Sequence, residues 1–342
     1  MNKLLSVIVP CYNSQDYLRR AVDSLLPGGD RLEILIVDDG STDATGLIAD
    51  DYARSYPQRV RAIHQPNGGH GGAIMAGLRE ASGRYFRVVD SDDWVEPDAL
   101  TKTLDALEAL EARGEPVDMF ITNFIFDKAA RHRHRVRYKG VLPEGWVFGW
   151  EDTRRFRVGD LLMIHAVSFR TGLLRDCGLA LPEHCCYEDN LFVYLPLSNV
   201  EKLYYLDVDL YHYVIGRQGQ STQVSVILKR LDQQLAINRE MFRAVELDWT
   251  REPKRRYYML RYIEMVTSAT VVYLLLSGRR EDEAKLDAFL REVRECAPKT
   301  YRWFCRYPVT YSPIVIFMYS PKWLARRLIN ALYRFAQWYF AF

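Results

Sequence analysis

The chain has 342 residues, of which 49% are hydrophobic and 26% are charged, enough for one or two domains with a substantial core. The formal net charge of +2 is too small to indicate a nucleic-acid-binding surface. The first apolar run ends at Pro10, which is too short for a secretory signal. No stretch reaches the roughly 18 uncharged apolar residues of a membrane span, so we predict a cytoplasmic protein.

Short apolar strands alternate with amphipathic helices in the first hundred residues. Four strands are expected, each followed by a helix: Leu4–Pro10, Leu32–Val37, Val60–His64 and Arg84–Val89. The spacing predicts Ser14 as the cap of the first helix, and Ser41, Thr42 or Asp43 as the cap of the second. The third helix is expected at Ala73–Ala81, and Pro97 starts the fourth. This order is typical of right-handed βαβ units on a parallel sheet.

Acidic residues follow the second and fourth strands. Asp38 and Asp39 follow one strand, and Asp90, Asp92 and Asp93 follow the other. In an open α/β sheet, ligands bind at the carboxyl ends of the strands. So much like charge predicts a bound cation, and oxygen ligands favour Mg²⁺ or Mn²⁺. The alternative is an acidic turn in which an aspartate caps the next helix.

A glycine-rich loop, Pro66–Gly72, follows the third strand at the same edge of the sheet. Its glycines would let backbone N–H groups approach a ligand, and a following helix N-terminus favours phosphate. The loop matches neither G-x-G-x-x-G nor a P-loop. We therefore reject a dinucleotide oxidoreductase and a P-loop kinase.

The chain resembles the family 2 glycosyltransferases of GT-A fold in three segments that occur in order within residues 5–100: SVIVPCYNSQDYLRRAVDSLL, ILIVDDGSTDAT and NGGHGGAIMAGLREASGRYFRVVDSDDW. The resemblance implies an α/β fold with a Rossmann-like, mostly parallel sheet flanked by helices. It also implies that Pro10, Tyr12 and Asn13 line the base and ribose of a nucleotide-sugar. Asp39 would contact the base, with Asp38 beside it.

The Asp-x-Asp element of the family matches Asp90 and Asp92, on either side of Ser91. The resemblance implies Asp90 near the ribose and Asp92 on a Mn²⁺ or Mg²⁺ ion that bridges the diphosphate, so both are candidate metal ligands. Many members carry Ser-Ala-Arg-Asn where this chain has its glycine run. The donor contacts of Gly68, Gly69 and His70 therefore stay open, and a solvated loop histidine is the alternative for His70.

A second candidate site lies in Leu179–Leu195, where Glu188 and Asp189 open a helix. The pair resembles the Glu-Asp element of the family, whose aspartate is the general base of inverting enzymes. We assign the base to Asp189 and a supporting role to Glu188. The alternative is an acidic first turn that complements the helix dipole.

Two further segments carry candidate cations. Arg217 follows the strand expected at Leu203–Tyr213, in a segment that resembles the family's Tyr-x-Tyr-x-x-Arg-x-x-Ser, and would bind the donor diphosphate. Arginines also alternate along Arg131–Lys139. We favour a solvated edge strand for this segment over contact with a phosphorylated acceptor or anionic lipid.

The pattern turns helical after residue 220. We expect a GT-A nucleotide-sugar-binding and catalytic domain over residues 1–220 and an α-helical extension over 221–342. The segment Lys322–Trp338 forms an amphipathic helix without acidic residues. Such a helix can lie peripherally in a membrane interface, at the inner face of the cell membrane, and a dimer-forming or partner-facing helix is the alternative.

We therefore predict an inverting, divalent-metal-dependent glycosyltransferase. It would move a sugar from a nucleotide-sugar, with a UDP-sugar favoured, to a hydroxyl of a polysaccharide, glycolipid or lipid-linked acceptor. A catalytically idle nucleotide-sugar-binding scaffold is the alternative. A nucleotidyltransferase is disfavoured because the glycine- and lysine-rich first loop is missing after Pro10.

Overall fold

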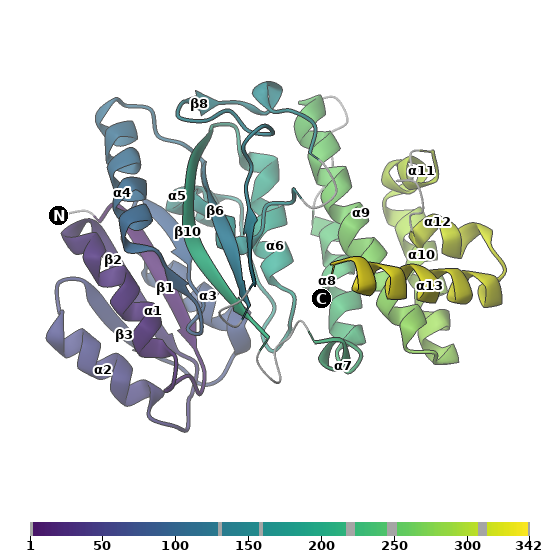
Figure 1. The fold of residues 1–342 in the computed structure, drawn as a ribbon, viewed down its shortest axis with the longest axis horizontal. Helices are drawn as coiled ribbons and strands as arrows, with labels where there is room; N and C mark the ends of the chain where they lie inside the picture. The colour runs from purple at the N-terminus through teal and green to yellow at the C-terminus, as the bar shows by residue number, and fades with distance from the viewer. Residues whose placement is uncertain are drawn as a thin grey trace. The chain divides into compact units, whose positions relative to one another are not determined.

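The computed structural model describes residues 3–128, 132–156, 160–216, 223–244, 252–306 and 313–340. The chain forms two compact units, Met1–Gln218 with Glu252–Arg255, and Gly219–Arg251 with Arg256–Phe342. The described strands all lie in the first unit, and the second is helical (Figure 1). The roles assigned to residues 1–220 and 221–342 stay predictions.

Four parallel strands form one half of the sheet, in the order β3-β2-β1-β4. Their bounds are Leu5–Cys11 for β1, Leu32–Asp38 for β2, Val60–His64 for β3 and Tyr85–Val88 for β4. All residues of β1, β2 and β4 are buried, as expected of strands covered on both faces. The predicted βαβ arrangement is confirmed.

The other half of the ten-stranded sheet is mixed. β9 (Val167–Arg170) runs antiparallel between β4 and β6 (Met119–Lys128), and β6 pairs in parallel with β10 (Leu203–Ile215). Three short antiparallel strands complete it: β5 (Trp94–Val95) and β8 (Val147–Phe148) on β10, and β7 (His132–Val136) on β6. Strands β1, β2, β4, β6 and β10 therefore end at one edge of the sheet.

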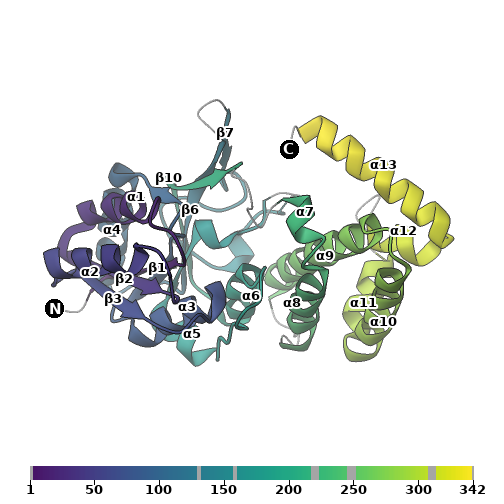
Figure 2. The same cartoon turned by 90° about the horizontal axis from the view of Figure 1, so that it is seen from below.

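Helices cover both faces of the sheet. Helices α1 (Leu18–Leu25) and α4 (Pro97–Ala112) lie on one face, and α3 (Gly69–Glu80) and α5 (Thr171–Asp176) on the other (Figures 1 and 2). The remaining helices of this unit are α2 (Thr45–Ser55), α6 (Asp189–Tyr194), η1 (Leu26–Arg31), η2 (Trp150–Asp152), η3 (Ile164–Ala166) and η4 (Leu195–Asn199).

Two helix starts differ from their expected caps. The side chain of Ser14 does not cap α1; its hydroxyl donates to the carbonyl of Tyr12 and lies 2.8 Å from the hydroxyl of Ser91. At α2, the Asp43 carboxylate accepts from the N–H of Thr45, so the acidic candidate supports that helix start. Tertiary partners thus decide where these short polar side chains bond.

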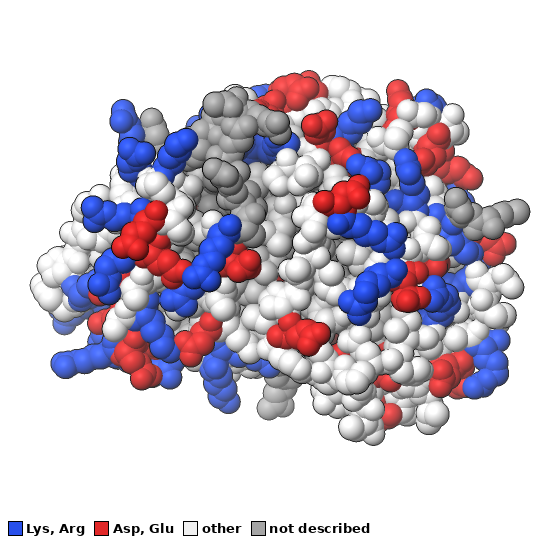
Figure 3. All heavy atoms as spheres, turned by 180° about the vertical axis from the view of Figure 1, so that it is seen from behind, with Lys and Arg blue, Asp and Glu red and all other residues white. Residues whose placement is uncertain are grey.

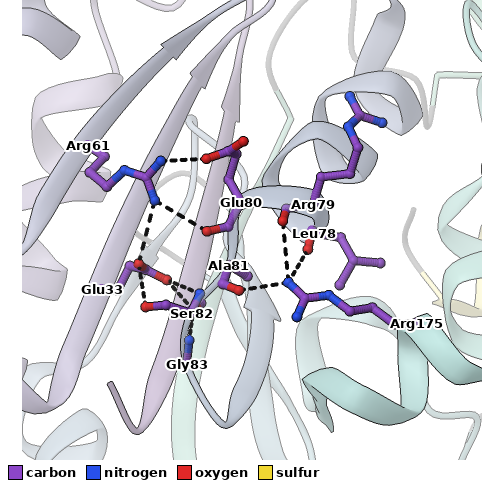
Figure 4. A network of polar contacts seen from close by, with 10 residues as sticks. Glu33, Arg61, Leu78, Arg79, Glu80, Ala81, Ser82, Gly83 and Arg175 are labelled. Atoms are coloured by element: carbon purple, nitrogen blue, oxygen red, sulfur yellow. Dashed lines mark hydrogen bonds and ion pairs between the residues drawn. The ribbon is translucent and has the colours of Figure 1, made fainter. Parts of the chain in front are cut away.

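Helix α3 begins at Gly69 rather than at Ala73 as predicted, so the glycine run forms its first turn. Its other end is held by Arg175 of α5, whose guanidinium donates to the carbonyls of Leu78 and Ala81, both at 2.7 Å (Figure 4). Arg175 thus satisfies carbonyl groups that the end of α3 leaves without intrahelical partners.

A buried carboxylate fastens the end of α3 to the sheet. Glu33 of β2 is 6% exposed and accepts hydrogen bonds from the hydroxyl of Ser6 and from the N–H and hydroxyl of Ser82 (Figure 4). The neighbouring Arg61 lies 4.0 Å from Glu33 and 2.6 Å from Glu80. Because Glu33 is buried and Glu80 is half exposed, the two acids should contribute very differently to stability.

Replacing Glu33 with alanine is expected to lower the free energy of unfolding by about 2–4 kcal/mol, because it leaves buried donors without acceptors. The matched variant Glu80→Ala removes only an exposed ion pair and should cost about 1 kcal/mol or less. Urea denaturation of both variants measures the difference. Equal losses would show that Glu33 has no special role in stability.

The second unit is an assembly of helices. Its helices are α7 (Val224–Ile227), α8 (Leu231–Ala244), α9 (Pro253–Leu276), α10 (Arg280–Cys296), α11 (Pro298–Arg306), α12 (Pro313–Tyr319) and α13 (Lys322–Phe340). By length and composition, α9 is the one described helix that could cross a membrane, although 61% of its apolar window is buried inside the protein. From the sequence, no such stretch is expected, because the helix also contains the charged residues Arg261 and Glu264.

Charged side chains of both signs are interspersed on the face drawn in Figure 3, where Lys and Arg lie beside Asp and Glu. The arginines predicted on an edge strand also lie beside acidic side chains. Arg133, Arg135 and Arg137, on and just after β7, each lie within 3.6 Å of a carboxylate, from Asp127, Asp209 and Asp207. These ion pairs favour the edge-strand interpretation.

Candidate active site

The loops after β1 and β2 are joined at the carboxyl edge of the sheet. Asn13 has a left-handed backbone, with φ of 49°, and its side-chain oxygen accepts from the N–H of Thr42 at 2.8 Å. Its own N–H donates to the hydroxyl of Ser41. Tyr12, beside it, is 52% exposed and offers a ring on which a nucleobase can stack. Pro10 is buried within β1.

Asp39 organises the glycine-rich segment. Its carboxylate is 2% exposed and accepts from the side-chain amide of Gln65 at 2.6 Å and from the N–H groups of Gly68 and Gly69, both at 2.8 Å. A carboxylate at this point favours the helix N-terminus, which explains the early start of α3. The N–H groups of Gly68 and Gly69, expected to face a phosphate, are directed at Asp39 instead.

Asp38 supports the neighbouring loop. One oxygen accepts from the N–H of Ser41 at 3.1 Å, and the other lies 3.0 Å from Nδ1 of His64. Nε2 of His64 lies 3.1 Å from Asp50, and these two hydrogen bonds raise the pKa of His64. Asp38 therefore fixes the loop after β2 to β3.

His70 connects the two acidic elements. In the first turn of α3, its Nε2 lies 2.8 Å from Asp90 and its Nδ1 lies 2.6 Å from Glu188. Burial opposes the charge on His70, but the two carboxylates raise its pKa well above the ordinary value. Both ring nitrogens can then donate. Burial would raise the pKa of Asp90, but the charge of His70 and the polar interactions of Asp90 with the side chains of His165 and His70 lower it.

The glycine run allows this contact. A Cβ atom on Gly69, whose φ is 77°, would lie 2.9 Å from the backbone nitrogen of His184. A Cβ atom on Gly71 would lie 2.8 Å from the carbonyl of Pro182 and 3.0 Å from the side chain of Glu188. The missing side chains let the segment before α6 pack against α3. That packing brings Glu188 within reach of His70.

Asp189 is the first residue of α6 and directly follows Glu188. Burial and the charge of Glu188 raise the pKa of Asp189 to about 6. The side-chain amide of Asn190 donates to one of its oxygens at 3.1 Å. A carboxylate with this pKa is ionised at neutral pH and is more basic than an ordinary aspartate, which suits a general base.

Among the described residues, ligand atoms of Asp90, Asp93 and His165 lie within 4.8 Å of one another and could hold a metal ion. Burial and the charge of Asp90 raise the pKa of Asp93 well above its ordinary value. Nδ1 of His165 is buried and has no hydrogen-bond partner among the described groups. A divalent cation would relieve the repulsion between the two carboxylates, so this donor set fits a divalent metal ion. Of the two predicted ligands, the set contains Asp90 and not Asp92.

Of the predicted residues, His70 thus contacts both Asp90 and Glu188 directly. Ser91 is buried, and Asp92 is partly exposed between Ser91 and Asp93. Arg217 lies outside the described residues.

Sequence reasoning missed two residues that line this site. Tyr211 of β10 donates its hydroxyl to Asp93 at 2.6 Å, and His165 of η3 lies 3.8 Å from Asp90. His165 also stacks on the ring of Tyr213, with centroids 4.3 Å apart. His165 lies in no motif, and a polar residue in an apolar segment was its only signal. Tyr211 belongs to the Tyr-x-Tyr element before Arg217, but no role was assigned to it.

The sheet order, its flanking helices and the carboxylate-rich site at one edge define a protein of GT-A fold. This fold agrees with Staphylococcus aureus TarS 1–349 in complex with UDP-GlcNAc, which has a TM-score of 0.70, 19% identity, and coverage of 97% of this chain and 92% of that one. Residues 6–175 match the model of glycosyl transferase family 2. The chain belongs to this family.

Two further proteins are similar to this chain. The putative glycosyltransferase EpsH of Bacillus subtilis is 30% identical over 226 residues, which cover 62% of this chain and 60% of EpsH. The mannosyltransferase PcManGT of Pyrobaculum calidifontis, in complex with GDP-Man and Mn²⁺, has a TM-score of 0.55 at 16% identity and covers 97% of this chain and 86% of that one. The chain spans less than two thirds of the length of the curated relatives it matches first: 60%, 25% and 28%.

Proposed function

We propose that this protein is an inverting, divalent-metal-dependent glycosyltransferase that transfers a sugar from a nucleotide-sugar to an acceptor hydroxyl. One observation carries the proposal: the ring of His70 forms hydrogen bonds with both Asp90 and Glu188. Asp90 belongs to the predicted metal-binding element with Asp92, and Glu188 directly precedes the predicted base Asp189. Groups for the leaving diphosphate and for the attacking hydroxyl thus belong to one connected site. The complexes of TarS with UDP-GlcNAc and of PcManGT with GDP-Man and Mn²⁺ support such a donor.

In the proposed reaction, Asp189 accepts the proton of the acceptor hydroxyl as its oxygen attacks the anomeric carbon. The bond from that carbon to the diphosphate oxygen breaks on the opposite face, and the nucleoside diphosphate leaves. Asp90 and Asp92 would hold Mn²⁺ or Mg²⁺, which supplies positive charge for the diphosphate. Tyr12 would stack on the base, with Asn13 and Asp39 nearby.

We further propose a UDP-sugar as the donor, and as the acceptor a polysaccharide, a glycolipid or another lipid-linked carbohydrate of the cell surface. The protein would act in the cytoplasm at the inner face of the cell membrane, with its C-terminal helix as a peripheral contact. A homodimer formed through that helix is the alternative arrangement. A catalytically idle nucleotide-sugar-binding scaffold remains the second candidate function.

A thermal-shift screen tests the donor site. We expect one class among UDP-, GDP-, CDP- and dTDP-sugars to raise the unfolding midpoint in the presence of Mn²⁺. A ligand at a hundred times its Kd adds about 2.7 kcal/mol to the free energy of unfolding. Chelator or Asp92→Ala should remove the shift. The absence of a metal-dependent shift with every nucleotide would contradict the proposal. If the protein binds a nucleotide-sugar but releases no nucleoside diphosphate with any of the cell extracts tested as sources of acceptor, the scaffold function would be favoured.

A further inference from the structure

Large exposed hydrophobic side chains gather near the end of the helical unit. Tyr319 at the end of α12 is 68% exposed, and Trp323, Leu328 and Leu332 of α13 are 64%, 41% and 36% exposed. Single exposed hydrophobic residues are ordinary on protein surfaces. Three such side chains on α13 and one at the end of α12 concentrate exposed apolar surface in this part of the chain, and such surface needs a partner.

Other side chains of α13 already have their partners. Ala325 and Ile329 are buried, and Lys322 and Arg326 form ion pairs with acids of α10, Asp287 and Glu283. These contacts fix which face of the helix points outward. Figure 2 shows α13 continuing as a long helix past α12.

The charge on this part of the chain has one sign. From Ala297 to Phe342 the sequence contains seven Lys and Arg residues and neither Asp nor Glu. Two of the arginines, Arg327 and Arg334, are exposed on α13. The acids that balance Lys322 and Arg326 come from α10, so the outward face carries positive charge.

We propose that the outward face of α13, formed by Trp323, Arg327, Leu328, Leu332 and Arg334, docks on an anionic lipid bilayer. Tryptophan and leucine enter the boundary between headgroups and acyl chains, while the arginines meet lipid phosphates. The lack of any acid in this segment removes the repulsion that anionic lipid would exert. The proposal does not depend on the transfer reaction, since binding to lipid needs neither donor nor acceptor.

Flotation of the full chain with vesicles tests this surface. We expect binding to vesicles of phosphatidylcholine with phosphatidylglycerol, weaker binding to phosphatidylcholine alone, and release by salt. The double variant Arg327→Gln/Arg334→Gln should bind the anionic vesicles on the order of tenfold more weakly. Trp323→Ser/Leu328→Ser should weaken binding to both kinds of vesicle.

Two control variants make the result specific. Leu47→Ser removes a side chain that is 70% exposed on α2, and Trp146→Ser removes a tryptophan that is 50% exposed elsewhere; neither should change vesicle binding. Equal binding by the α13 variants and these controls would overturn the proposal. So would a homodimer, found by sedimentation without lipid, that Trp323→Ser/Leu328→Ser dissociates. Unchanged midpoints of urea denaturation would show that each variant is folded, whether or not the protein binds a nucleotide-sugar.

Discussion

Replacing Asp189 with asparagine is expected to lower kcat by about 10²–10⁴-fold while donor binding is unchanged. The amide has the shape of the carboxylate but cannot accept the proton of the acceptor hydroxyl. Measured turnover and a nucleotide-sugar thermal shift on the same preparation separate the two effects. A variant that retains wild-type turnover would show that another group is the base.

The pH profile gives a second test of Asp189. Its pKa of about 6 means that the ionised form, which the reaction needs, increases as pH rises through that value. We therefore expect kcat to rise towards neutral pH and then level, and the residual activity of Asp189→Asn to lack this rise. An unchanged acid limb in the variant would assign that titration to a different group.

Stability should not explain the loss of activity. The pKa of Asp189 is raised from 3.8 to about 6 in the folded protein, so the folded state holds the proton more tightly than the unfolded chain. The free energy of unfolding therefore falls as pH rises through this window and the group ionises. Asp189→Asn removes that ionisation. Its unfolding midpoint at pH 8 is expected to equal or exceed that of the wild type.

The parallel half of the sheet was predictable because each strand is a short apolar run that ends in a turn or acidic loop. β1 and β2 are buried along their whole length, so their hydrophobic residues are continuous in the sequence. The start of α3 was not predictable from local pattern. Glycines usually weaken a helix, and here the carboxylate of Asp39, from another loop, supports the helix start.

The acidic motifs marked the candidate site, but its internal contacts depend on distant segments. His70 and Glu188 are 118 positions apart, and the glycines that allow them to meet were interpreted as ligand contacts. Sequence reasoning gave Asp93, which follows the predicted metal ligands, no role of its own. Its carboxylate accepts hydrogen bonds from the hydroxyl of Tyr211 and from the N–H of Val214. Sequence shows which residues can react; the packing of loops shows which of them touch.

Removing His70 is expected to have the second large effect. His70→Ala leaves Glu188, whose side chain is 4% exposed, as an unpaired buried carboxylate. We expect the free energy of unfolding to fall by about 2–3 kcal/mol. This loss is smaller than the loss expected on breaking a fully buried ion pair, because the side chain of His70 is 35% exposed. Turnover should fall as well, because Asp90 and Glu188 lose the group that holds them together.

A matched control and a double variant separate this role from general packing. His64 also bridges two carboxylates, Asp38 and Asp50, but its side chain is 47% exposed, so His64→Ala should cost less stability. Adding Glu188→Gln to His70→Ala removes the unpaired charge and should recover part of the lost stability, whereas turnover should stay low. Urea denaturation of the four proteins in the His70 and Glu188 cycle measures the coupling. Additive losses of stability would mean that the two side chains act independently. That result would contradict the proposal that His70 connects the two acidic elements.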